Sequence, residues 1–131
     1  MALLSKEQIL EAEDFTFEDV EVPAWGGTVR VRALSGAERD HFESSIVEQR
    51  GKKTHMNMVN LRARLVALAV IDDKGRRIFS SKDVEALGRK NAAALNQVFE
   101  AAQRLAGLRD EDLDELTENF PDDPNAGSTS S

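Results

Sequence analysis

The pattern of apolar and polar positions first predicts two strands joined by a turn. Strand-forming apolar residues recur through residues 15–22, and in residues 28–33 valine and alanine alternate with threonine and arginine. The segment 23–27, with its proline and two glycines, favours a turn between them. We therefore expect an antiparallel hairpin with one buried face. The uneven step from Phe17 to Val20 predicts a bulge in the first strand.

Two capping-box sequences predict helices on either side of this hairpin. Residues 5–8 and residues 35–38 both have serine followed three residues later by a glutamine or glutamate, which satisfies unpaired amides of a first helical turn. The first predicts a short N-terminal helix. The second predicts a helix over residues 35–50, which ends before Gly51.

Apolar stripes and caps predict the remaining helices. Two stripes follow Thr54 and predict a buried central helix that ends near Ile71, before a turn at residues 72–75. Ile78 and Phe79 are then expected to pack back as a short extended segment. A short helix from Ser81 to about Leu87 and an amphipathic helix capped by Asn91 and ending at Gly107 are expected to close over the core.

These elements predict an α+β fold class, with an N-terminal antiparallel β-hairpin packed on a bundle of about four to five helices. Residues 1–120 are expected to form a single α+β domain, with a last acidic helical turn that Asp110 caps. Residues 121–131 lack large apolar side chains and are rich in proline, aspartate and serine, so we expect a disordered acidic tail.

Composition narrows the class of protein. The 131 residues include no cysteine, which excludes disulfides and thiolate chemistry, and no apolar run or leader suggests a membrane span or a secreted protein. We therefore expect a soluble cytoplasmic chain. The formal net charge is -7. Residues 110–131 contain eight acidic residues and no basic residue, so the rest of the chain, residues 1–109, is near neutral. An acidic end repels phosphate backbones and makes nucleic-acid binding unlikely.

The chain contains no recognisable catalytic, cofactor or metal site. Residues 51–54 lack the first glycine of a phosphate-binding loop, and residues 110–121 lack the glycine and glutamate of a calcium loop. His41 and Ser45 are one helical turn apart, but a helix side supplies no oxyanion donors. His41 and His55 are the only histidines, so zinc would need carboxylates from elsewhere.

Basic residues and the single tryptophan are the candidates for partner contact. The simplest interpretation of the basic residues is a solvated surface. Trp25 either caps the core or remains exposed as a contact anchor. We expect the outward face of the hairpin and the loop at residues 50–54 to make the contacts. The candidate partner-binding residues are Trp25, Arg30, Arg32, Arg50, Lys52 and Lys53.

The order of these pieces resembles that of a known family. A capped helix, the Trp25-Gly26-Gly27 turn and residues 29–34 lead into the second capping box, and the similarity continues to Phe120. The further matching segments are residues 62–66, 72–75, 78–80, 83–88, 92–95, 104–108 and 116–119. On these residues the chain resembles the tail assembly chaperones of long-tailed, non-contractile (siphovirus-type) bacteriophages.

The resemblance implies a non-enzymatic protein and transfers no catalytic residue. Its expected partners are the tape measure protein, which it would keep soluble, the tail tube protein, whose subunits it would help to recruit, and further copies of itself. It would act in the cytoplasm of an infected or lysogenic bacterium and be absent from the mature virion. Such families often have a longer form made by programmed frameshifting.

An alternative hypothesis remains open at this point. The chain would then be a small nucleic-acid-binding or regulatory protein that uses the basic residues between Arg30 and Arg64.

Overall fold

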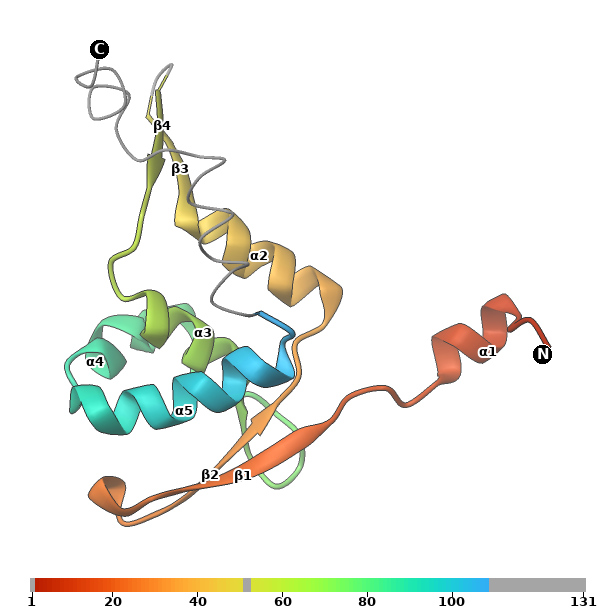
Figure 1. The fold of residues 1–131 in the computed structure, drawn as a ribbon, viewed down its shortest axis with the longest axis horizontal. Coiled ribbons are helices and arrows are strands. Elements are labelled where there is room, and N and C mark those ends of the chain that lie inside the picture. Colours follow the sequence, from red (N-terminus) through yellow and green to blue (C-terminus); the bar gives the residue numbers. More distant parts are fainter. Residues whose placement is uncertain (1, 51–52, 109–131) are drawn as a thin grey trace.

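The computed structural model describes residues 2–50 and 53–108, and the side chains of residues 48–50 and 53–56 are left aside. The expected acidic turn after Asp110, the disordered tail and the domain boundary at residue 120 lie outside the described residues. In order, the elements are α1 (Lys6–Glu11), β1 (Phe17–Val22), the 3-10 turn η1 (Pro23–Trp25), β2 (Gly27–Arg32), α2 (Gly36–Ile46), β3 (Val47–Arg50), β4 (Lys53–Met56), α3 (Leu61–Ala69), β5 (Val70–Ile71), the 3-10 turn η2 (Ser81–Asp83), α4 (Val84–Gly88) and α5 (Ala92–Leu105). The predicted α+β fold is confirmed (Figure 1).

The predicted hairpin is formed by β1 and β2. Their antiparallel register runs without interruption from Phe17 opposite Arg32 to Val22 opposite Gly27, so the expected bulge is wrong. The uneven apolar spacing instead places Phe17 on the outer face, while the valines of both strands face the core. Gly26 closes the turn with a positive φ of 77°, a conformation that suits glycine.

A third strand completes this sheet. β5 pairs antiparallel with β2, which gives the strand order β1-β2-β5. The sequence pattern had assigned these two residues to the end of the central helix, which ends at Ala69 instead. Arg77 then bridges back to Ile71 after the turn at residues 72–75. Phe79 packs against the core as expected, whereas Ile78, also expected to pack back, is 52% exposed because the extended segment turns successive side chains to opposite sides.

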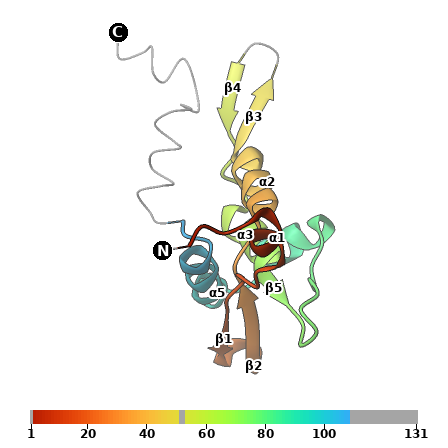
Figure 2. The same ribbon diagram turned by 90° about the vertical axis from the view of Figure 1, so that its right-hand side faces the viewer.

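A small second sheet replaces the neighbouring ends of two predicted helices. α2 ends at Ile46 rather than near residue 50, and α3 begins at Leu61 rather than after Thr54. β3 and β4 lie between them and pair antiparallel as a hairpin that projects from the body (Figure 2). The cross-strand pairing of these segments therefore overrides the helical pattern that the sequence shows after Thr54, because it satisfies their backbone amides and carbonyls.

The core lies between the first sheet and the helices. α5 packs against β1, β2 and α3, and α4 packs against the other side of α3. The largest fully buried side chains are Val22, Val31, Phe42, Ile46, Leu65, Val66, Val70 and Val98. As predicted, Asn91 caps α5 by accepting a hydrogen bond from the Ala94 amide at 3.0 Å. Within the described residues, no helix has the length and apolar character to cross a bilayer.

The N-terminal helix is confirmed but takes no part in this core. Ser5 and Gln8 form the predicted capping box, and all six residues of α1 are exposed. Figure 1 shows α1 projecting from one side of the body, on the side opposite α4. The segment from residue 2 to residue 14, called the N-terminal arm below, therefore carries its apolar side chains into solvent.

Candidate functional site

The outer face of the first hairpin brings two predicted contact residues next to two aromatic side chains. Arg30 lies over the Phe17 ring at 4.4 Å from its centroid, and Arg32 lies over the Phe15 ring at 5.0 Å. Both rings are more than half exposed. We call these four residues the aromatic–arginine face. Arginine and aromatic side chains are the types that most often dominate the energy of protein interfaces.

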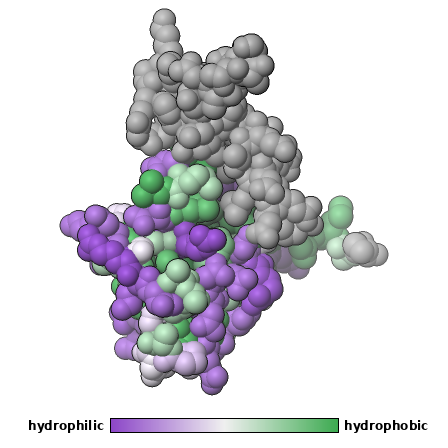
Figure 3. Space-filling view, turned by 60° about the vertical axis from the view of Figure 1, so that its left-hand side comes forward, coloured by the Kyte–Doolittle hydropathy of each residue, from purple (hydrophilic) through white to green (hydrophobic). Residues whose placement is uncertain are grey.

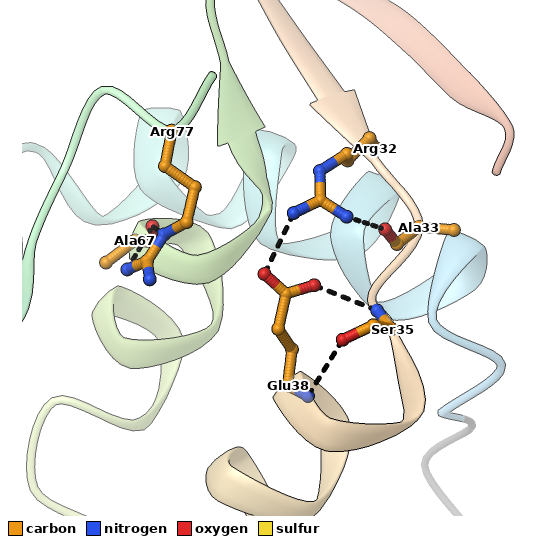
Figure 4. Close-up of polar contacts among 6 residues, drawn as sticks. All are labelled: Arg32, Ala33, Ser35, Glu38, Ala67 and Arg77. Carbon is orange, nitrogen blue, oxygen red and sulfur yellow. Dashed lines mark hydrogen bonds and ion pairs between the residues drawn. The ribbon is translucent and has the colours of Figure 1, made fainter. Parts of the chain in front are cut away.

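Ion pairs hold both arginines in place. Arg30 donates hydrogen bonds to Asp19 at 2.8 and 3.1 Å, and these bonds lower the pKa of the Asp19 carboxyl. Arg32 donates to Glu38 at 2.8 Å and to the carbonyl of Ala33 at 3.0 Å (Figure 4). The ion pairs therefore hold the two guanidinium groups over the aromatic rings, where the side chains of Arg30 and Arg32 remain 34% and 18% exposed.

Glu38 links this face to the start of α2. Its carboxylate accepts the Ser35 amide at 2.8 Å in addition to the bond from Arg32. Burial alone raises the pKa of Glu38, but the hydrogen bonds from Ser35 and the charge of Arg32 outweigh burial, so the pKa lies below its usual value. The ionised carboxylate thus fixes the hairpin to α2.

Two of the other predicted basic residues lie away from this face. Arg50 and Lys53 are opposite each other at the end of the β3–β4 hairpin (Figure 1), and Lys52 lies outside the described residues. The structure therefore does not bring the five described candidate residues into one site.

Trp25 is half-buried in η1 and packs against the core, so it combines the two expected alternatives. It lines a cavity of about 270 Å³ together with Phe79, Ala86, Leu87 and Lys90 among others. Among the described residues, its buried indole nitrogen has no hydrogen-bond partner. The indole therefore covers one edge of the core with its apolar ring.

The histidine–serine pair of α2 forms no catalytic arrangement. The hydroxyl of Ser45 donates to the carbonyl of Phe42 at 2.6 Å, and Arg64 donates to the hydroxyl and the carbonyl of Ser45 at 3.0 and 2.7 Å. Arg64 also donates to the carbonyl of Asn57. These bonds join the end of α2 to α3. Within the described part of the chain, no group of three potential metal ligands is present.

A second arginine supports the end of α3. Arg77 donates to the carbonyl of Ala67 at 3.2 and 3.3 Å, where the last turn of the helix leaves carbonyls without helical partners (Figure 4). Several basic residues of the body thus have structural partners. Part of the charge that suggested a basic surface in the sequence is therefore used within the fold.

A groove of about 750 Å³ lies between the starts of α3 and α5 and the end of α4. We call it the α3–α5 groove. Apolar residues line part of it, and Arg62 and Lys90 supply positive charge. Arg62 is oriented by a 2.9 Å hydrogen bond to Asn96 and by the Phe99 ring. Figure 3, which turns the left-hand side of Figure 1 toward the viewer, shows hydrophobic surface among hydrophilic surroundings on this side of the body.

The profile of the phage tail assembly chaperone family matches residues 5–119 of the sequence. The chain belongs to the phage tail assembly chaperone family. The resemblance identified from the sequence motifs is thereby confirmed, and membership implies protein partners in the assembly of a phage tail.

A solved structure supports the same fold for this chaperone. The bacteriophage HK97 tail assembly chaperone is similar with a TM-score of 0.54 and 18% sequence identity, over 79% of this chain and 95% of that chain. At this identity the likeness concerns the fold alone. No curated protein matches the sequence.

The exposed apolar side chains of the chaperone are the candidate functional residues that the sequence interpretation missed. On the N-terminal arm, Leu3, Leu4, Ile9 and Leu10 are between 57% and 94% exposed. Figure 3 shows hydrophobic side chains on the segment that projects to the right of the body. The sequence offered little signal for this, because α2, which is part of the core, has a similar excess of acidic residues.

Proposed function

We propose that this chaperone binds the tape measure protein of its phage, keeps that protein soluble, and helps to recruit tail tube subunits around it. The protein performs this role without catalysis, as a binding scaffold present in several copies on one client. It acts in the cytoplasm of the infected or lysogenic bacterium and leaves the tail before the virion is complete. A longer form made by frameshifting adds a second binding domain to the same scaffold.

The aromatic–arginine face is the observation that supports client binding. Phe15 and Phe17 remain more than half exposed although the core nearby is well packed. A long apolar client aggregates unless its apolar side chains find cover, and exposed aromatic rings on a folded domain supply such cover. Arg30 and Arg32 orient the rings and keep the face hydrated when no client is present.

The nucleic-acid alternative finds less support in the same contacts. Arg30, Arg32, Arg62 and Arg64 each donate to an acceptor within the chain. A phosphate backbone would have to compete with those acceptors for the same donors. The contacts of these four arginines therefore favour a structural role for them.

The test is co-expression of the chaperone with the tape measure protein encoded nearby. We expect the client to become soluble, in a complex whose mass by light scattering corresponds to several copies of the chaperone. Phe15→Ser combined with Phe17→Ser should reduce the soluble fraction strongly, because the change removes the exposed rings and leaves the core intact.

The matched control is Ile78→Ser, which removes a similarly exposed apolar side chain outside this face. Arg30→Ala is a second probe, because it removes the cation above Phe17 without touching the Arg32–Glu38 pair. An insoluble client beside a folded, unbound wild-type chain would overturn the proposed function. If Ile78→Ser reduced the soluble fraction of the client as much as the double phenylalanine variant does, the aromatic–arginine face would not be the client-binding surface.

A further inference from the structure

We propose that the N-terminal arm of one copy docks into the α3–α5 groove of a second copy, so that copies of the chain join head to tail. This inference deepens the self-association within the proposed function and rests on that part of it. In this arrangement the client binds the aromatic–arginine face, and neighbouring copies bind each other through the arm and the α3–α5 groove.

The arm has the features of a preformed binding element. Its capping box gives α1 a defined start, with the Ser5 hydroxyl accepting the Gln8 amide at 3.2 Å. Leu4 and Ile9 occupy the two positions of a hydrophobic staple on either side of that cap. A short helix that presents exposed leucine and isoleucine is stabilised by burying them against a second surface, and its ordering cost is partly met before binding.

The groove is complementary to the arm in shape and in charge. Met58, Leu61, Ala93 and Leu95 offer an apolar lining for the arm's leucine and isoleucine side chains, and Arg62 and Lys90 lie beside them. Among the described residues that line it, none is acidic. The arm carries Glu7, Glu11, Glu13 and Asp14 against Lys6 alone. Opposite charges at the rim of an apolar contact set its orientation and favour the correct partner.

In the structure the arm of a chain lies away from the groove of the same chain. β1 runs antiparallel to α5, because Glu18 accepts from Arg104 near the end of α5 while the carbonyl of Glu21 accepts from Gln97. The arm therefore leaves the body at the end of α5, whereas Ala93 and the groove lie at its start, about 17 Å away along the helix axis.

The free length of chain between α1 and the sheet is shorter than this distance. The carbonyl of Thr16 accepts the Ala33 amide at 2.9 Å, which extends the β1–β2 ladder by one residue. The stacking of Arg32 on Phe15 holds the preceding residue as well. Residues 12–14 then span at most about 10 Å when fully extended. Figure 1 shows α1 and α4 on opposite sides of the body, so the arm is directed away from the groove of its own chain.

Because the arm and the groove are different surfaces, each copy donates one arm and receives one. A contact of this kind is heterologous and continues from copy to copy until it closes into a ring or extends as a filament. Such an assembly places one aromatic–arginine face per copy along an extended client.

The experiment mixes two variants that are defective in different surfaces. Ile9→Glu combined with Leu10→Glu disables the arm, and Lys90→Glu combined with Ala93→Glu disables the groove. We expect wild-type chain to have the mass of several copies by light scattering, and each variant alone to have the mass of one chain. An equimolar mixture should form a species of two chains, because one intact arm and one intact groove remain.

Both variants are expected to fold. The residues of α1 are exposed, and Ala93 lies in the first turn of α5, where a negative charge is favourable. The matched control is Lys82→Glu with Ala37→Glu, which makes the same charge change at exposed positions outside the arm and the groove, Ala37 again lying in the first turn of a helix. The control should keep the wild-type mass.

Several results would overturn the inference. These are a wild-type chain of single-chain mass at all concentrations, an arm variant that keeps its assembled mass, or a mixture that stays at single-chain mass. An arm variant that stays assembled but no longer keeps the tape measure protein soluble would assign the arm to the client instead. Insoluble client beside successful two-chain mixing would reject the proposed client binding and leave the docking of copies in place.

Discussion

Helices α1 and α2 begin with the same local structure and have different fates. In each, the backbone amide of the capping serine donates to the side chain three residues later at 2.8 Å. The serine hydroxyl accepts from the backbone amide of that same later residue, at 3.2 Å in α1 and 3.1 Å in α2. α2 then buries Phe42 and Ile46, whereas α1 is exposed along its whole length. A capping box thus determines where a helix begins, and burial of a face determines whether the fold depends on it.

The largest effect should come from removing an apolar side chain from each helix. Phe42 is 1% exposed, and Phe42→Ala should lower the free energy of unfolding by about 3–5 kcal/mol, because it leaves a cavity in the core. Leu10→Ala should change it by less than about 0.5 kcal/mol in dilute monomer. Urea unfolding of both variants checks the difference, and equal losses would mean that α1 packs on the body.

The end of α2 also depends on the body, through Arg64 of α3. Arg64 donates to the carbonyl of Ser45 in the last turn of α2 and to the carbonyl of Asn57 before α3, so Arg64→Met should lower the free energy of unfolding by about 1–3 kcal/mol by leaving these acceptors without their donor. Arg89→Met, at the end of α4, is the control, because the side chains of the Arg89–Glu85 pair are 72% and 77% exposed, and it should cost less than about 1 kcal/mol. Similar costs in thermal unfolding would contradict the structural role of Arg64.

Removing the caps separates local helix formation from global stability. Ser35→Ala should lower the free energy of unfolding by about 1 kcal/mol, because the Glu38 amide loses its acceptor in a helix that the core requires. Ser5→Ala removes the same bond from α1 and should leave the global unfolding transition unchanged. Its effect should appear in the amide hydrogen exchange of residues 6–11, and a shift of the global transition would show that α1 belongs to the folding unit.

The smallest expected effect is a pH dependence of stability, which only the capping box of α2 should show. The folded pKa of Glu38 lies below its ordinary value, so its ionised form contributes stability at pH values above the unfolded pKa, and that stability is lost as the pH falls through the folded pKa. Gln8 does not titrate. In unfolding measured from pH 7 to pH 3, the advantage of wild type over Glu38→Gln should therefore shrink, by less than about 1 kcal/mol. A constant difference would argue against the Arg32–Glu38 pair.

The candidate site shows where sequence interpretation is strong and where it is weak. Arg30 and Arg32 were correctly placed on the outer face of the hairpin, because strand alternation assigns faces directly. Their partners Asp19 and Glu38 were not foreseen, since each contact depends on the register or on a neighbouring helix. The groove between α3, α4 and α5 depends on how three helices pack, and no motif marks it.

The sequence by itself determined the features whose causes lie within a few residues. The capping boxes at Ser5 and Ser35, the cap at Asn91 and the turn at Gly26 all appear as predicted, because a cap or turn needs only its own side chain and the next amides. Only the tertiary structure decided the state of residues 47–50 and 53–56 and of Val70 and Ile71. These segments become strands because a partner strand satisfies their amides and carbonyls, and that partner is found only when the chain has folded.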